Sequence, residues 1–222
     1  MRGFYLTRTE MGTILKTIRR QEIPDKILLK AMKRSGSEKE ELPTIFAKLS
    51  KATEGSFGFS INEIATLGNQ LEYASFRSTA VQNWVKRDIK EWIGAPQLGK
   101  KYAIEQAAIL FIVEDLKNTH DFESIRLLLK FAFNNPADRN DDLIDPLAFY
   151  TAYSQLFEAI HTKVKPTKEG IRKKAMELSS IFSDLTEKQK EDIEKLLISA
   201  ALSVQASFYQ SLSKQYLEDV WR

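Results

Sequence analysis

The sequence predicts a mainly α-helical fold. Only nine glycines and six prolines occur in 222 residues, strand-like alternation is rare, and apolar residues recur at helical spacing along most of the chain. Hydrophobic residues make up 43% and charged residues 28%, which is the balance of a packed globular protein. We expect N-terminal helices, a helix-turn-helix head with a short β-hairpin wing, and a C-terminal helical bundle.

Residues 1–56 are expected to form an N-terminal helical segment of two or three short helices. Ile23-Pro24, the stretch 34–39 and Leu42-Pro43 interrupt the helical spacing, because proline and glycine end helices. Residues 35–38 and 54–56 are expected loops.

Residues 57–135 are expected to form the head, which contains four helices. The first begins at Ser60, which has a glutamate three residues later in the pattern of a capping box. Ser78 is the expected N-cap of the second helix, and the third spans about 103–118. Asp121 is the expected N-cap of the fourth, which ends before the next proline.

The expected wing lies between the second and third helices of the head. Residues 94–102 contain two glycines and a proline, which exclude a helix, and they close with two lysines and a tyrosine. This composition predicts a short β-hairpin-like wing with a basic tip.

Residues 136–222 are expected to form a helical bundle. Three helices follow Pro146, over about 147–162, 167–183 and 186–219, and Thr167 and Thr186 mark the last two starts. The last helix carries an apolar stripe: Ile193, Leu197, Ala200, Val204, Phe208 and Leu212. Packing within the monomer, a dimer seam and the wall of an effector pocket are the open interpretations of this stripe.

The expected helix from Ser78 to Trp92 has two different faces. Its apolar residues fall three or four apart and are expected to be buried: Val81, Trp84, Val85, Ile89 and Trp92. Its other face is polar and basic: Gln82, Asn83, Lys86, Arg87 and Lys90. The stretch 77–102 holds six basic and two acidic residues, so the excess positive charge of the chain concentrates there.

These residue types suit duplex DNA. Asparagine and glutamine amides match the donor and acceptor edge of adenine, which favours major-groove contacts by Gln82, Asn83, Lys86 and Arg87. Basic side chains and a helix N-terminus bind phosphates. Contacts with the DNA phosphates are therefore assigned to Arg77, Ser78, Thr79, Lys90, Lys100 and Lys101. Tyr102, at the end of the wing, completes the expected DNA-binding set. An ordinary amphipathic surface helix is the competing interpretation, and the wing and the two helices after it favour DNA binding.

The order of these elements resembles the winged head of MerR-type proteins. Three strings look, more specifically, like the bacterial family called domain of unknown function 1836 (YkrK-like proteins): FRSTAVQNWVKRDIKEW, GKKYAIEQAAILFIVEDLK and DFESIRLLLKF. The resemblance covers roughly residues 22–160, and it implies a DNA-binding transcription regulator.

The family typically shows the segment Leu-Thr-Lys-Thr-x-x-Asn-Asn-Tyr-Val-Lys. Its positions are occupied in this sequence by Phe76, Arg77, Ser78, Thr79, Gln82, Asn83, Trp84, Val85 and Lys86. Ser78 and Gln82 depart from the usual lysine and asparagine, and an additional Lys-Glu-Trp-Ile precedes the wing. These departures bear on the target sequence more than on the mode of binding.

Other chemical motifs are weak. Cysteine is absent, which excludes disulfides, thiolate metal sites and a cysteine nucleophile. The two histidines, His120 and His161, are expected at the surface, although Glu158 has the spacing of a ligand pair with His161. The aspartate-rich stretch 138–145 lacks the glycine of a calcium loop and is expected to cap the next helix. We expect no enzyme activity, no metal and no cofactor.

The sequence also predicts the cellular location. No apolar run approaches the ~20 residues that a spanning helix needs. The N-terminal string MRGFYLTRTEMG lacks the apolar core of a signal peptide. We therefore expect a cytoplasmic protein without membrane contact.

The leading hypothesis is a sequence-specific transcriptional regulator that binds double-stranded DNA as a homodimer and acts as a repressor. A small-molecule effector is a further partner that the helical bundle leaves open. The alternative is a non-enzymatic adaptor that uses a helix-turn-helix-like scaffold to bind another protein.

Overall fold

The computed structural model describes residues 3–36, 44–49, 57–135, 141–162 and 167–221, and the regular elements in these ranges are helices. Strand pairing in the described residues is limited to isolated bridges. The predicted mainly α-helical fold is therefore confirmed. The helices are α1 (Arg8–Arg19), α2 (Asp25–Ser35), α3 (Thr44–Leu49), α4 (Ile61–Gly68), α5 (Ser78–Asn83), the π-helix η2 (Trp84–Asp88), α6 (Lys90–Ile93), α7 (Ile104–Leu116), α8 (Phe122–Phe133), α9 (Pro146–His161), α10 (Lys168–Ser179) and α11 (Glu187–Val220).

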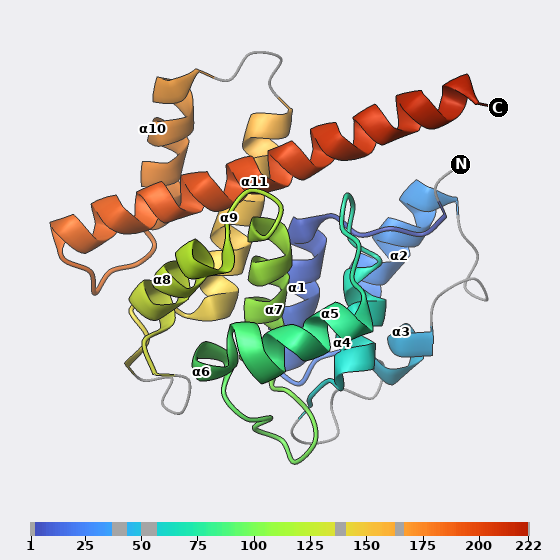
Figure 1. The fold of residues 1–222 in the computed structure, drawn as a ribbon, viewed down its shortest axis with the longest axis horizontal. Helices are drawn as coiled ribbons and strands as arrows, with labels where there is room; N and C mark the ends of the chain where they lie inside the picture. The colour runs from blue at the N-terminus through green and yellow to red at the C-terminus, as the bar shows by residue number, and fades with distance from the viewer. Residues whose placement is uncertain (1–2, 37–43, 50–56, 136–140, 163–166, 222) are drawn as a thin grey trace.

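Helix α7 is the centre of the molecule. Every one of its residues except Glu105 is buried, which is the pattern of a helix surrounded by others. Helices α1, α9 and α11 pack against it, and α5, η2 and the wing lie at the end of the molecule opposite α10 and α11 (Figure 1). The buried apolar residues of all these helices form one core.

A buried ion pair connects α1 to α7. Arg8 and Asp115 are 1% and 2% exposed, and their closest nitrogen and oxygen atoms are 2.7 Å apart. The guanidinium also donates to the carbonyl of Glu72 (2.7 Å), and the Tyr153 hydroxyl of α9 donates to the Asp115 carboxylate (2.7 Å). Burial by itself would lower the pKa of Arg8, but Asp115 outweighs it and the pKa is raised. The group thus joins α1, α7, α9 and the connection after α4.

Most of the predicted helix starts are confirmed. Ser60 and Thr186 form capping boxes with the side chains three residues later, and Asp121 and Thr167 accept from backbone N–H groups at their helix starts. Asp145 caps α9, as expected for the acidic stretch before it. Residues 37–39, 42–43 and 54–56 of the expected interruptions and loops lie outside the described residues, and Ser35, expected in a loop, is the last residue of α2.

Helix α10 ends at Ser179 and not near residue 183, so it is shorter than predicted. The hydroxyls of Ser179 and Ser180 donate to the carbonyls of Met176 and Glu177. These bonds satisfy carbonyls of the last turn, and serine side chains that bond locally favour helix ends.

The division into segments 1–56, 57–135 and 136–222 stays a prediction. The core is continuous across these boundaries, since residues of all three segments belong to it. In the part of the chain that the structure describes, no helix combines the length and the apolar character needed to cross a membrane.

We expect Arg8→Met to lower the free energy of unfolding by about 3–5 kcal/mol, because it leaves the Asp115 carboxylate buried without its partner. Arg19→Met is the matched control: Arg19 pairs with Asp145 at the surface, with both side chains more than a third exposed. That loss should be at most about 1 kcal/mol. Urea denaturation followed by circular dichroism measures both. Equal losses in the two variants would contradict the role of the buried pair.

Candidate nucleic-acid interface

The prediction of one continuous helix from Ser78 to Trp92 is wrong. Helix α5 passes into the π-helix η2, the chain kinks at Ile89 (φ −130°, ψ 22°), and α6 follows. The Ile89 N–H donates to the Trp84 carbonyl five residues earlier, at 2.9 Å, which is the bond of a π turn. Arg126 of α8 donates to the Asp88 carbonyl (3.1 Å), so tertiary contacts hold the end of η2.

The π turn changes which residues face the core. Val81, Trp84, Val85 and Ile89 are buried, as predicted. Trp92 is only partly buried, and Ile93 is fully buried in its place. A π turn contains one more residue than an α turn, so the buried position moves one residue along the chain.

Arg77, and not Ser78, is the N-cap of α5. The Val81 N–H donates to the Arg77 carbonyl (3.1 Å), so Ser78 already lies in the first turn. The Ser78 side chain does not cap the helix, because the hydroxyl of a capping residue must precede that turn.

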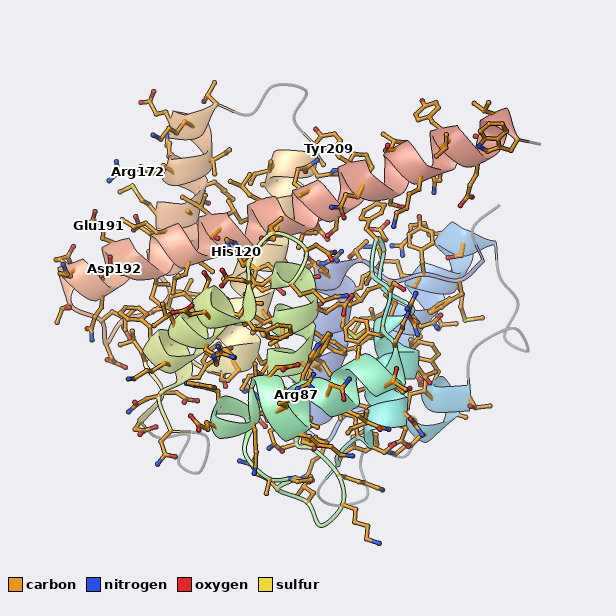
Figure 2. All side chains as sticks on the ribbon, viewed as in Figure 1. Arg87, His120, Arg172, Glu191, Asp192 and Tyr209 are labelled. Carbon is orange, nitrogen blue, oxygen red and sulfur yellow. The ribbon has the colours of Figure 1, made fainter. Side chains whose placement is uncertain are left out.

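Most of the predicted DNA-binding residues lie at the surface. The exposed ones are Arg77, Thr79, Asn83, Lys86, Arg87, Lys90, Lys100 and Lys101, and Ser78 and Gln82 are half-buried. Arg87, labelled in Figure 2, pairs with Asp88 at 3.2 Å and remains 72% exposed. Tyr102 differs from the others: it is buried, and burial raises the pKa of its phenol.

Residues 94–102, expected to form a β-hairpin wing and called the wing here, contain a tight turn with isolated bridges and no paired strands. Leu98 pairs with Lys101 around Gly99, which has a φ of +65° that favours glycine. Phe59, just before α4, pairs antiparallel with Tyr102 through two backbone bonds of 2.9 and 2.8 Å. These bridges fix the basic turn beside the start of α4.

A hollow of about 340 Å³ lies between the wing, α4 and α5. Residues from three separate parts of the chain line it, among them Ser60, Gln82 and Lys100. Of the predicted DNA-binding residues, Gln82, Lys100 and Tyr102 line this hollow.

Gln106 holds the base of the wing and is not among the residues predicted from the sequence. Its fully buried amide donates to the carbonyls of Ile93 and Ala95, both at 2.8 Å. Its Oε1 accepts from the N–H groups of Ala103 (2.9 Å) and Gln97 (3.3 Å). A lone amide within the apolar string AIEQAAILFIV was the signal that could have identified it.

Asn69 holds the connection between α4 and α5 by hydrogen bonds to its backbone, as Gln106 holds the wing. Its Oδ1 accepts from the Phe76 N–H (2.8 Å), and its Nδ2 donates to the Phe76 carbonyl (2.9 Å). The Phe76 ring covers Gly68, where an added Cβ would lie 2.5 Å from a ring carbon. The connection spans residues 69–77, longer than the three or four residues of a tight helix-turn-helix turn.

The histidines have structural contacts. The His120 ring nitrogen and the Ser199 hydroxyl are 3.0 Å apart, and the His161 ring packs on Phe208 with centroids 4.5 Å apart. Among the described residues, no three histidine or acidic side chains are arranged to hold a metal ion.

Comparison with known proteins agrees with the resemblance seen in the sequence. Residues 38–156, more than half of the chain, match the model of a domain of unknown function, DUF1836. The chain belongs to this family. It is also 38% identical to the uncharacterized protein YkrK of Bacillus subtilis (strain 168), over 99% of this chain and 100% of that protein. No solved structure matches the chain. The DUF1836 match contains the predicted interface, Asn69 and Gln106, whereas α10 and α11 follow it in the chain.

We expect Gln106→Leu to loosen the wing, because four backbone groups lose their hydrogen bonds to the Gln106 amide while a side chain of similar size fills the same space. The free energy of unfolding should fall by about 1–3 kcal/mol. Amide hydrogen exchange should accelerate at residues 95–103 more than in α9. Unchanged exchange in the wing would show that Gln106 does not hold it.

Proposed function

We propose that this DUF1836 protein is a sequence-specific DNA-binding transcriptional regulator without enzyme activity, and that it acts as a repressor. The observation that carries the proposal is the hollow between the wing, α4 and α5, where the exposed Lys100 and the amide of Gln82 line one surface. A duplex backbone is the polyanion that such a surface fits.

In this proposal the outer side of α5 and η2 enters the major groove. Asn83 is exposed and Gln82 lines the hollow, which supports base-edge contacts by both amides in this proposal. Lys86 and Arg87 follow within the next helical turn. Lys100 lines the same hollow, and the exposed Arg77, Lys90 and Lys101 are assigned with it to phosphates.

The head is proposed to be a MerR-type winged helix-turn-helix. The order of α4, α5 with η2, a bridged basic turn, α7 and α8 supports this fold. The long connection 69–77 is the main departure from a tight helix-turn-helix.

Helix α11 supports a homodimer. It has 34 residues, so it is roughly 51 Å long at 1.5 Å per residue. The predicted stripe is buried from Ile193 to Val204, which confirms packing within the monomer for this part. The last turns of α11 extend from the body (Figure 1). Their exposed apolar side chains are Tyr209, labelled in Figure 2, and Tyr216, Leu217 and Val220, and Trp221 is exposed just after the helix. A second copy covering this face would give the two-fold symmetry that operator binding uses.

A protein-binding adaptor is the second candidate. An apolar groove of about 450 Å³ between α8 and α11 favours it, since Leu127 and Phe131 are 66% and 40% exposed there. Gel shifts over a salt series separate the two functions. DNA binding that weakens with salt supports the regulator, and its absence with recovery of a protein partner supports the adaptor.

Two substitutions test the interface with genomic fragments selected by the wild-type protein. Asn83→Ala should lower discrimination at one base position by about 1–3 kcal/mol, because it removes a base contact. Lys100→Ala should weaken binding to all DNA sequences alike, because it removes a phosphate contact. It should also reduce the slope of log affinity against log salt concentration by about 1.

Lys188→Ala on α11 is the matched control, because this exposed lysine lies outside the proposed interface. Titrations on matched and single-mismatch duplexes measure all three variants. If Asn83→Ala and Lys100→Ala bind like Lys188→Ala, the proposed interface is wrong.

Sedimentation equilibrium tests the dimer. Leu217→Glu should shift the protein toward the 25.5 kDa monomer, because it places a charge in the proposed apolar contact. Leu127→Glu on α8 replaces a leucine of similar exposure and should leave the dimer intact. A monomeric wild type, or a dimer lost only with Leu127→Glu, would refute a dimer through α11.

A further inference from the structure

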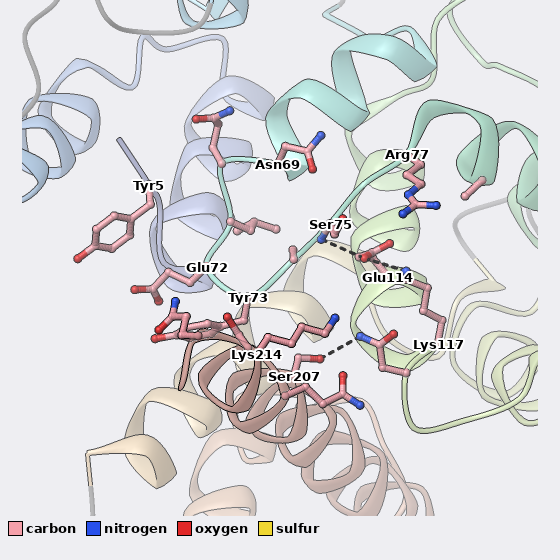
Figure 3. A pocket seen from close by; sticks show the side chains of 18 of the residues that line it. Tyr5, Asn69, Glu72, Tyr73, Ser75, Arg77, Glu114, Lys117, Ser207 and Lys214 are labelled. Carbon is pink, nitrogen blue, oxygen red and sulfur yellow. Dashed lines mark hydrogen bonds and ion pairs between the residues drawn. The ribbon is translucent and has the colours of Figure 1, made fainter. Parts of the chain in front are cut away.

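A cavity of about 720 Å³ lies where four segments meet (Figure 3). Its walls come from residues 3–5, the α4–α5 connection, the C-terminal end of α7 and the second half of α11. The volume falls within the range of about 300–1,000 Å³ that small-molecule sites occupy. The lining is polar, and Figure 3 shows its amide, hydroxyl and charged side chains around a common space.

The buried carboxylate of Glu114 is the notable group in this lining. The residue is 3% exposed, and its Oε1 accepts from Lys117 Nζ (3.1 Å) and from the Ser75 N–H (3.4 Å). Its Oε2 is also buried and has no hydrogen-bond partner in the described part of the chain. Burial raises the pKa of this carboxyl group. A buried carboxylate oxygen without a donor is costly, and an N–H group of a ligand would satisfy it.

Cationic groups on other walls complement Glu114. Lys214 of α11 and Arg77 at the start of α5 both line the cavity and are exposed. Neither forms an ion pair with the described residues. An anionic group in the cavity would gain charge-assisted hydrogen bonds from them. The lining therefore offers an acceptor for an amine and donors for an acid within one cavity.

We propose that this cavity binds a small zwitterion of the class of the free amino acids. Its amino group would donate to Glu114, and its acid group would accept from Lys214 and Arg77. Amides such as Asn69, Asn118 and Gln210 would hydrogen-bond a polar side chain. The ligand site depends only on the cavity, whereas its regulatory effect rests on the proposed DNA binding.

The position of the cavity couples a ligand to the interface. Arg77 is both a wall residue and the N-cap of α5. Tyr73, in the same wall, has a left-handed φ of +60° that is rare for a bulky residue, and its ring packs on Phe208 of α11 with centroids 5.0 Å apart. An occupant would contact both the base-contacting helix and α11, so it would bias their relative arrangement.

The first test uses thermal unfolding of the full chain without DNA, in the presence of each standard L-amino acid at millimolar concentration. At least one should raise Tm in a concentration-dependent way. Glu114→Gln and Lys214→Ala should each weaken that binding about tenfold or more, because each removes one charged partner. Lys188→Ala should keep it. No stabilising amino acid, or full stabilisation in both cavity variants, would overturn the proposal.

Analogues of the active amino acid refine this test. The same compound without its amino group, or without its carboxylate, should fail to stabilise the wild type. Equal stabilisation by either analogue would refute the zwitterion assignment.

The second test measures duplex binding with and without the active amino acid. A changed Kd in the wild type, absent in Glu114→Gln, supports coupling, and an unchanged Kd refutes it. If the amino acid raises Tm but the protein binds no DNA, the proposed function fails and the ligand site stands.

Discussion

The buried Arg8–Asp115 ion pair connects helices that are far apart in the sequence. It joins residues 107 positions apart and connects α1 to the central helix α7. Tyr153 adds α9, and burial together with the Asp115 charge holds the pKa of its phenol well above the usual value, so the hydroxyl remains a donor. Because Arg8 also binds the Glu72 carbonyl, this group positions the connection that leads to α5.

The proposed DNA interface and the cavity both involve that connection, because it leads into α5 and lines the cavity. Asn69 and Phe76 shape it from one side, and Glu114 holds the Ser75 N–H from the other. Gln106, on the same central helix α7, anchors the wing. One rigid helix thus positions both parts of the proposed DNA surface, and its C-terminal end supplies the buried carboxylate of the proposed ligand site. Because the connection 69–77 lines the cavity and leads into α5, a change in the cavity acts directly on the start of α5.

Features set by neighbouring residues were predictable from the sequence. The caps at Ser60, Asp121 and Thr186 depend on side chains within three residues, and all are present. The π turn at η2 was not predictable, because tertiary contacts such as Arg126 with the Asp88 carbonyl hold it. The Arg8 pair and the roles of Gln106 and Glu114 join distant segments, which helical periodicity does not show. The exposure of the basic residues on α5, on η2 and in the wing was predictable, because they lie within one short, positively charged stretch of the sequence.

Amide hydrogen exchange of the full chain, with and without a selected genomic duplex, measures whether DNA covers the proposed surface. Bound DNA should slow exchange at the start of α4, in α5 and η2, and in the wing around Gly99, while the first turns of α11 exchange as before. Protection confined to the α8–α11 groove, or no protection at a saturating concentration of duplex, would contradict it.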